Sequence, residues 1–127
     1  MPEEYYNLFV EYKIMHYLIK LKIYPNLKGY SYIVQGIKIL LDDSTKKKNI
    51  IKNIYEVLAK CFNTDAASVD SSLHHAIKIC RKNNGLECYK KEIQGLDDGK
   101  LPTPREFLSS ISFVIKRDLI KESKKFA

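Results

Sequence analysis

Apolar residues recur along most of this chain at spacings of three and four, which is the periodicity of amphipathic helices. Interrupted by turn residues, this pattern predicts helices over Tyr5–Lys22, Tyr30–Leu41, Lys47–Cys61, Asp65–Lys82, Leu86–Ile93 and from Thr103 onward. No stretch of useful length alternates between apolar and polar residues as a strand does. The pattern therefore predicts an all-α fold of about six helices.

The first predicted helix is rich in apolar and aromatic residues. Its apolar positions are Leu8, Phe9, Tyr12, Met15, Leu18, Ile19 and Leu21, and its tyrosines are Tyr5, Tyr6, Tyr12 and Tyr17. We expect most of these side chains to pack into the core. The alternative is a surface through which the chain associates with itself.

Several helix ends are marked by residues with a specific backbone role. Thr103 is a good capping residue, with Pro104 at the first helical position and Glu106 three residues after the cap. Asp65, or Thr64 before it, is expected to cap the fourth helix. Gly85 suits the left-handed conformation that often ends a helix, so the fourth helix is expected to end there.

The third and fourth predicted helices have the features of a helix-turn-helix. Ala59 is small where two helices must cross closely, and Asn63 tolerates the positive φ that the turn needs. Phe62, between them, is expected to fill the core. The inward stripe of the fourth helix consists of Val69, Leu73, Ala76, Ile77 and Cys80.

The outward face of the fourth helix is polar in its first half and basic in its second. In a major groove the first half would meet base edges through Ser68, Asp70, Ser71, His74 and His75. The phosphates would meet Lys78, Arg81 and Lys82 of the second half and Lys60 of the third helix.

The net charge of +7 is concentrated in the middle of the chain. Between Ser44 and Lys91 there are ten Lys and Arg against four Asp and Glu. Such a concentration of positive charge favours a polyanionic partner. Lys46, Lys47 and Lys48 are further candidate phosphate contacts, with an exposed, solvated lysine surface as the alternative.

Other classes of protein find little support in the sequence. The 127 residues suit one domain, and no apolar run approaches the roughly 20 residues of a membrane span. Without signal-peptide features, the chain is expected to be cytoplasmic. The three cysteines form no CxxC pair, and His74 and His75 point about 100° apart on a helix, so neither a metal nor another cofactor is expected. No arrangement of catalytic residues indicates an enzyme.

Four segments give the chain a resemblance to a known family. They are Lys28–Ile33; Ile54-Tyr55 with Leu58–Thr64; Ala67–Val69 with His75–Ile77; and Pro102-Thr103 with Glu106-Phe107. On these segments, over roughly residues 14–120, the chain resembles the C-terminal effector domain of the stage zero sporulation protein A, a response regulator of endospore-forming bacteria.

The resemblance implies a single six-helix domain over residues 1–127, with residues 1–13 as a helical extension. Its third and fourth helices would form the helix-turn-helix. The implied partners are double-stranded DNA, bound at a short promoter box and often by tandem copies, and sigma factors of RNA polymerase. The implied role is activation or repression of sporulation-phase genes.

Family regulators also carry a phosphoacceptor receiver domain ahead of the effector domain. About fourteen residues precede the matching region here, so we expect a regulator that acts without a receiver. Phosphorylation-driven dimerisation would then not be available within this chain, and the first helix is the candidate surface for self-association.

The base-facing positions depart from the family pattern. The family typically has arginines where Ser68, Ser71 and His74 stand and a glutamate where Asp70 stands, whereas His75 matches. Arginine is the usual reader of guanine, and each such contact contributes about 1–3 kcal/mol of discrimination. The chain could therefore read another sequence, bind DNA weakly and without specificity, or have lost DNA binding. In the last case it would be a protein-interaction module that binds or antagonises a full-length regulator or a polymerase subunit.

Overall fold

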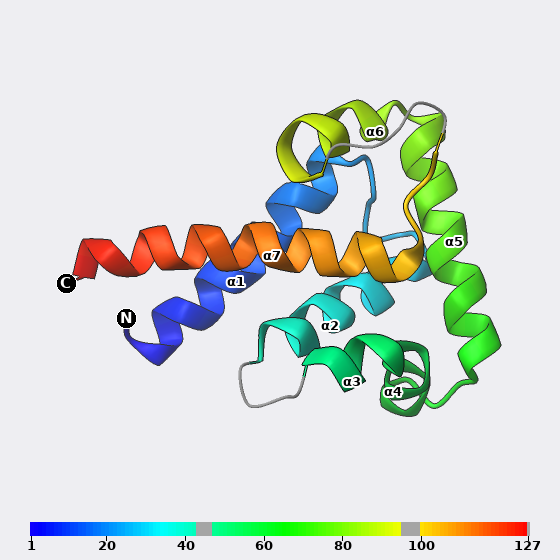
Figure 1. Ribbon diagram of the computed structural model, residues 1–127, viewed down its shortest axis with the longest axis horizontal. Helices are drawn as coiled ribbons and strands as arrows, with labels where there is room; N and C mark the ends of the chain where they lie inside the picture. Colours follow the sequence, from blue (N-terminus) through cyan, green and yellow to red (C-terminus); the bar gives the residue numbers. More distant parts are fainter. Residues whose placement is uncertain (43–46, 95–99, 127) are drawn as a thin grey trace.

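The computed structural model describes residues 1–42, 47–94 and 100–126, and in these residues it contains helices and no strand (Figure 1). The α-helices are α1 (Glu3–Lys20), α2 (Gly29–Leu41), α3 (Lys47–Lys52), α4 (Ile54–Cys61), α5 (Ala66–Lys82), α6 (Gly85–Cys88) and α7 (Pro104–Ser123). A π-helical turn (Tyr89–Ile93) follows α6, and a 3-10 turn (Lys124–Phe126) follows α7. The predicted all-α fold is confirmed.

The third predicted helix is divided in two. Asn53 lies between α3 and α4 with φ −106° and ψ 20°, outside helical geometry. The guanidinium of Arg105 lies near the end of α3, where its Nε and Nη2 donate to the carbonyls of Ile51 and Lys52 at 3.3 and 3.4 Å. The carbonyl groups at the end of α3 therefore accept hydrogen bonds from Arg105 of α7.

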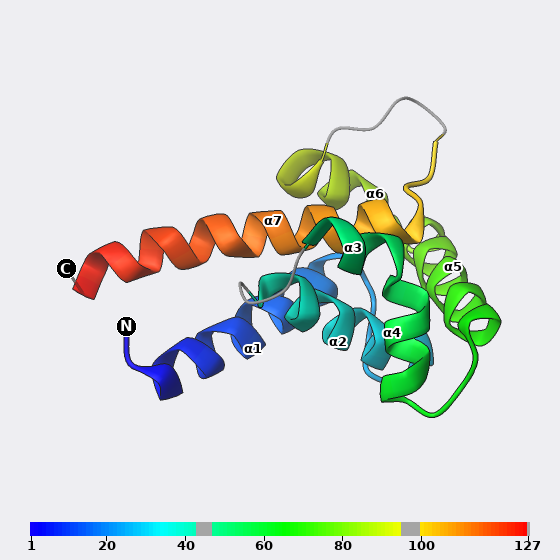
Figure 2. The ribbon, with the colours of Figure 1, turned by 60° about the horizontal axis from the view of Figure 1, so that its bottom comes forward.

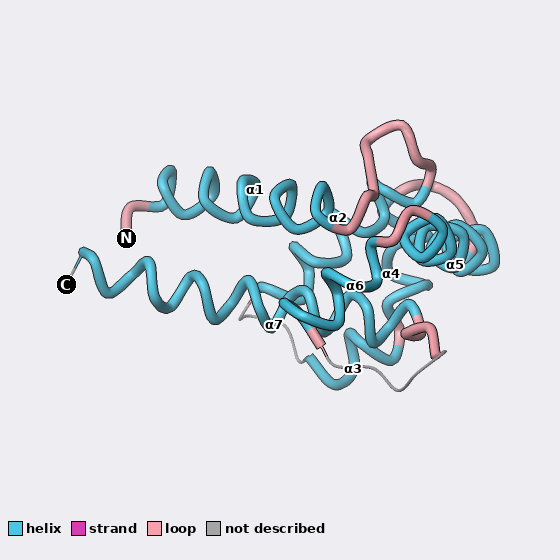
Figure 3. The backbone as a smooth tube through the Cα atoms, turned by 90° about the horizontal axis from the view of Figure 1, so that it is seen from above, coloured by secondary structure: helices cyan, strands magenta, loops and turns pink. Residues whose placement is uncertain are grey.

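The helices are arranged around α2. The long helices α1 and α7 lie side by side and carry the two chain termini to the same end of the molecule (Figures 1 and 3). At the opposite end, α4 and α5 pack against each other and against α2 (Figure 2). This layout places α5 along one edge of the molecule, far from the termini.

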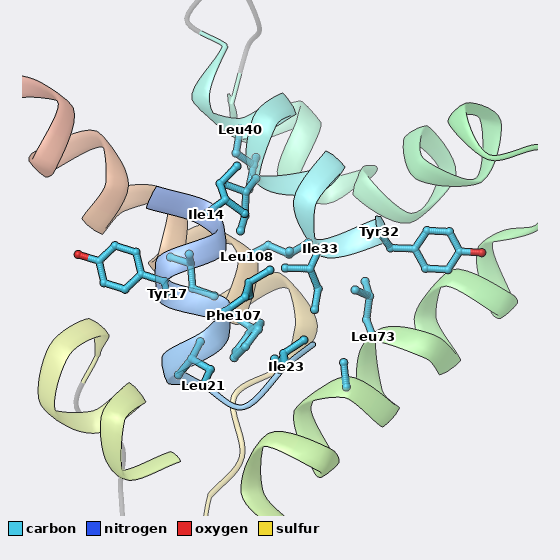
Figure 4. Close-up of a cluster of buried hydrophobic side chains, with 14 of the residues drawn as sticks. Ile14, Tyr17, Leu21, Ile23, Tyr32, Ile33, Leu40, Leu73, Phe107 and Leu108 are labelled. Carbon is cyan, nitrogen blue, oxygen red and sulfur yellow. The ribbon is translucent and has the colours of Figure 1, made fainter. Parts of the chain in front are cut away.

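One hydrophobic core joins α1, α2, α4, α5 and α7 (Figure 4). Ile14 of α1, Ile33 of α2 and Leu73 of α5 point into it, as do Phe107 and Leu108 of α7. All five side chains are at most 2% exposed. The core therefore fixes α5 relative to α1, α2 and α7.

The expected core face of α1 is largely wrong. The buried side chains of α1 and of the residue after it are Val10, Ile14, Tyr17, Leu18 and Leu21, whereas Leu8, Tyr12, Met15 and Ile19 are exposed. The helix is apolar on two faces, and the face that docks also makes polar contacts with α7: the Tyr17 hydroxyl donates to Asp118 at 2.6 Å, and Lys13 pairs with Asp118 at 2.9 Å. Periodicity within one helix carries no information about such a distant partner.

Two glycines permit close contacts around α5. A Cβ at Gly29, the first residue of α2, would lie 2.6 Å from the carbonyl oxygen of Ser72 and 3.3 Å from Cβ of Ala76. A Cβ at Gly85 would overlap the carbonyl oxygen of Leu21. The predicted left-handed role of Gly85 is wrong, because Asn84 adopts that conformation (φ 64°) and Gly85 begins α6.

The predicted start of α7 is confirmed. The Thr103 side chain accepts from the Glu106 amide at 3.2 Å, and the Glu106 carboxylate accepts from the Thr103 amide at 3.1 Å. This reciprocal capping box, with Pro104 at the first helical position, satisfies two backbone donors at once.

Replacement of Gly29 by alanine is expected to destabilise the protein by about 1–3 kcal/mol, the usual cost of overpacking. The new methyl group would meet the backbone of Ser72, which cannot yield as a side chain can. Urea denaturation measures the loss. The control is Gly36→Ala, whose methyl group would meet only the flexible ends of Leu108 and Leu58, with a smaller expected change. Equal stability of Gly29→Ala and the wild type would contradict the close crossing.

Candidate nucleic-acid interface

The turn between α4 and α5 has the geometry that a helix-turn-helix requires. Asn63 has φ 52°, in the left-handed region, and the Thr64 amide donates to the Ala59 carbonyl at 2.9 Å. Ala59 is 6% exposed, in keeping with the small residue expected at a helix crossing. The roles predicted for Asn63 and Ala59 are both confirmed.

The N-terminus of α5 is capped by Asp65. Its carboxylate accepts from the Ser68 amide at 2.7 Å, and this hydrogen bond is the main cause that lowers the pKa of Asp65. The positive charge of Lys28, which precedes α2, also contributes to this lowering. An exposed lysine therefore lies near the start of α5, a position that the sequence pattern did not reveal.

Phe62 does not fill the core as expected. Its side chain is 38% exposed and packs edge-to-face on Tyr32, with ring centroids 5.0 Å apart and planes 81° apart. The contact places an aromatic side chain at the surface beside the turn. The predicted role fails because Leu58 and Ala59, both buried, already occupy the interior at this end of α4.

The two faces of α5 divide as predicted. The inner face buries Val69, Ser72, Leu73, Ala76, Ile77 and Cys80. On the outer face the exposed residues are Ala67, Ser71, His74, His75, Lys78, Arg81 and Lys82, while Ser68 and Asp70 are half-buried at its borders. Helix α5 itself lies along one edge of the molecule (Figure 2). The structure therefore brings the predicted base-facing residues onto one helix face, and Ala67, which the sequence reading missed, joins them.

Asp70 is held by its neighbours rather than freely presented. His74 approaches it with Nε2–Oδ1 3.2 Å, and the Tyr55 hydroxyl of α4 donates a hydrogen bond to it. Burial, followed by this hydrogen bond, raises the pKa of Tyr55 to about 12. Two of the predicted base-facing residues, Asp70 and His74, thus form one polar unit anchored on α4.

The anchor extends to α7 through a cation–π contact. The Arg105 guanidinium lies 4.2 Å from the centre of the Tyr55 ring. Because Arg105 also donates to the carbonyls at the end of α3, it links three helices behind the outer face of α5. This link was not predicted, because residues about fifty positions apart in the sequence form it.

The predicted phosphate-facing lysines and arginine are placed in part. Lys60 of α4 and Lys78, Arg81 and Lys82 of α5 are all exposed. Lys46 lies outside the described residues. Lys47 and Lys48 are the first residues of α3, but their side chains are not among those that the structure describes. At the C-terminal end of α5, Arg81, Lys90 and Lys100 line a hollow of about 270 Å³ together with Glu87. Lys90 and Lys100 therefore extend the basic surface beyond the predicted set.

The described part of the chain shows no metal centre. No group of three or more His, Cys, Asp or Glu side chains lies close enough there to hold a metal ion. None of the described helices is both long and apolar enough to cross a membrane. The polar outer face of α5, with lysine and arginine side chains beside it, is suited to contact a polyanion.

Comparison with known protein families gives one match. The family described as Sporulation initiation factor Spo0A C terminal matches residues 14–115. The match begins within α1, includes α4, the turn and α5, and ends within α7. It therefore covers most of the chain and the whole of the candidate interface.

Removal of the Tyr55 hydroxyl is expected to change the response of stability to pH. Since the folded-state pKa of Tyr55 is raised to about 12, its hydroxyl stabilises the fold fully below pH ~10 and loses that contribution as pH rises toward 12. Tyr55→Phe should therefore cost about 1 kcal/mol at pH 8, and its difference from the wild type should shrink at pH 11.

The measurement is urea denaturation of both proteins at the two pH values, with the exposed Tyr24 changed to Phe as control. The control should match the wild type at both. A Tyr55→Phe deficit that is unchanged at pH 11 would rule out the buried, hydrogen-bonded hydroxyl.

Proposed function

The chain belongs to the Spo0A C-terminal family of sporulation initiation factors, whose domains are DNA-binding effector domains, and from that premise we propose that it is a DNA-binding transcriptional regulator. In this proposal α5 enters a major groove, and the α4–α5 turn sets its angle. Such a role places the protein in the compartment that holds the DNA.

The outer face of α5 is the observation that carries the proposal. Its exposed residues change from short and polar at Ser71 to cationic at Lys78, Arg81 and Lys82. Phosphate contacts orient a protein on DNA, and side chains near the helix start reach base edges. Lys28, near the start of α5, and Lys60, in the last turn of α4, are both exposed and would add phosphate contacts beside the turn.

The proposed recognition relies more on charge than on base reading. Ser68 and Ser71 offer single hydroxyl groups, and no arginine stands among the base-facing residues. Bidentate arginine–guanine contacts are therefore absent from this set, and less discrimination between base pairs follows. Asp70 can accept a hydrogen bond from a cytosine amino group, but its contacts with Tyr55 and His74 restrict its reach.

We propose that this activity is not controlled by phosphorylation of a receiver within these 127 residues. A receiver is built on a parallel sheet, whereas the described residues contain no strand. A sigma factor of RNA polymerase is a further proposed partner, on the family resemblance alone.

Reversal of the charges of Lys78 and Lys82 to glutamate should weaken binding to random-sequence duplex DNA by at least tenfold at about 100 mM salt. Both lysines are exposed on the outer face of α5, and loss of two phosphate contacts should also lower the salt-dependence slope by about 2. Fluorescence anisotropy at several salt concentrations gives both quantities.

The matched control reverses Lys121 and Lys124, which are exposed at the far end of α7. This variant changes the net charge by the same amount and should lose far less affinity. If both double variants lose affinity equally, binding follows net charge and the proposed face is wrong.

Asp70→Asn should tighten non-specific DNA binding several-fold. The carboxylate is 43% exposed at the border of the outer face, and its charge opposes nearby phosphates. Anisotropy with the same random duplex provides the measurement. A weaker complex with every duplex would instead make Asp70 a required contact.

The second candidate function is a protein-interaction module that antagonises a full-length regulator or a polymerase subunit without reading DNA. The observation that favours it is the polar, arginine-free set Ser68, Ser71 and His74. Affinity capture from the host, beside sequencing of the DNA that is enriched with the protein, separates the two. Loci that share one motif support the regulator, and a protein partner without DNA enrichment supports the antagonist.

A further inference from the structure

Helix α1 carries a second apolar face that the fold does not bury. We define the α1 stripe as Tyr5, Leu8, Tyr12, Met15 and Ile19, which are 39, 71, 54, 48 and 48% exposed. At 100° per residue these positions lie opposite the buried side chains of the same helix. The two-sided character of α1 thus leaves a continuous apolar seam on the surface.

The spacing of the α1 stripe is that of a helix-pairing seam. Its members follow one another at intervals of three, four, three and four residues, the alternation of positions a and d in a coiled coil. A groove of about 350 Å³ runs along this seam, where Tyr30 and Val34 of α2 add to its wall. The surface can therefore receive the side chains of another helix.

We propose that the occupant of the α1 stripe is the α1 stripe of a second copy of this chain, in antiparallel orientation. A seam with 3-4 spacing is complementary to a helix with the same spacing, and a second copy supplies one without a foreign partner. In the antiparallel arrangement Leu8 faces Ile19 of the second copy, and Tyr12 faces Met15 of the second copy.

Charge at the ends of α1 selects the antiparallel orientation. The helix begins with Glu3 and Glu4 and ends with Lys20, with Lys22 just beyond. Lys20 already pairs with Glu92 at 2.7 Å, whereas Glu4 and Lys22 are both exposed. Antiparallel copies bring Glu4 of each beside Lys22 of the other, while parallel copies bring like charges together.

The location of the α1 stripe leaves α5 accessible. The start of α1 lies at the end of the molecule that carries the termini, and α5 lies at the other end (Figure 3). Tyr5, Leu8 and Tyr12 precede residue 14, where the family match begins. Three of the five residues of the α1 stripe therefore lie outside the matched range.

The test is analytical ultracentrifugation of the full chain without DNA, over concentrations up to about 100 µM. The wild type should sediment as a monomer–dimer equilibrium. Leu8→Glu and Met15→Glu should each raise the dissociation constant about 30-fold or more, with unchanged helix content and melting temperature because both side chains are exposed. The control is Phe113→Glu, which alters an apolar side chain of α7 that is 73% exposed and should leave the equilibrium unchanged.

Orientation is tested by charge exchange. Glu4→Lys and Lys22→Glu should each weaken association, and the double variant should recover it. A wild type that remains monomeric at the highest concentration overturns the proposal, as does equal weakening by Phe113→Glu. Binding of a monomeric wild type to anionic vesicles, lost in Leu8→Glu, would identify the stripe as a membrane-contacting face and also overturn it.

Discussion

The close crossing of α2 over α5 holds α5 in place and determines which of its faces is exposed. At Gly29 the absence of a side chain lets the start of α2 contact the backbone of α5 at Ser72, with the small Ala76 beside it. The contact holds the middle of α5, and the buried stripe from Val69 to Cys80 fixes its rotation. Because one face of α5 is buried against the core, the side chains of the opposite face are the ones exposed to solvent.

Features encoded within a few residues could be predicted from the sequence. The left-handed turn at Asn63, the cap at Asp65 and the capping box at Thr103 all depend on local backbone chemistry, and each forms as expected. The inner and outer faces of α5 could also be predicted, because the apolar residues of this helix form a single stripe. Local signals were therefore sufficient for the helix-turn-helix and for the general placement of the candidate interface.

Features decided by distant residues could not be predicted. Helix α1 has two apolar faces, and the one that is buried also carries Tyr17 and Lys13, which contact Asp118 of α7. The contacts of Asp70 likewise depend on Tyr55, which in turn stacks under Arg105. Each of these contacts joins two or three helices, and the spacing of residues within a single helix does not predict it.

An NMR titration shows whether the outer face of α5 is the DNA-contacting surface. The measurement follows backbone amide shifts of the isotope-labelled protein as a short random-sequence duplex is added. We expect the largest changes at the α4–α5 turn and along the exposed residues from Ala67 to Lys82, with small changes in the first half of α1. Shifts concentrated on α1 or on the end of α7, with α5 unaffected, would contradict it.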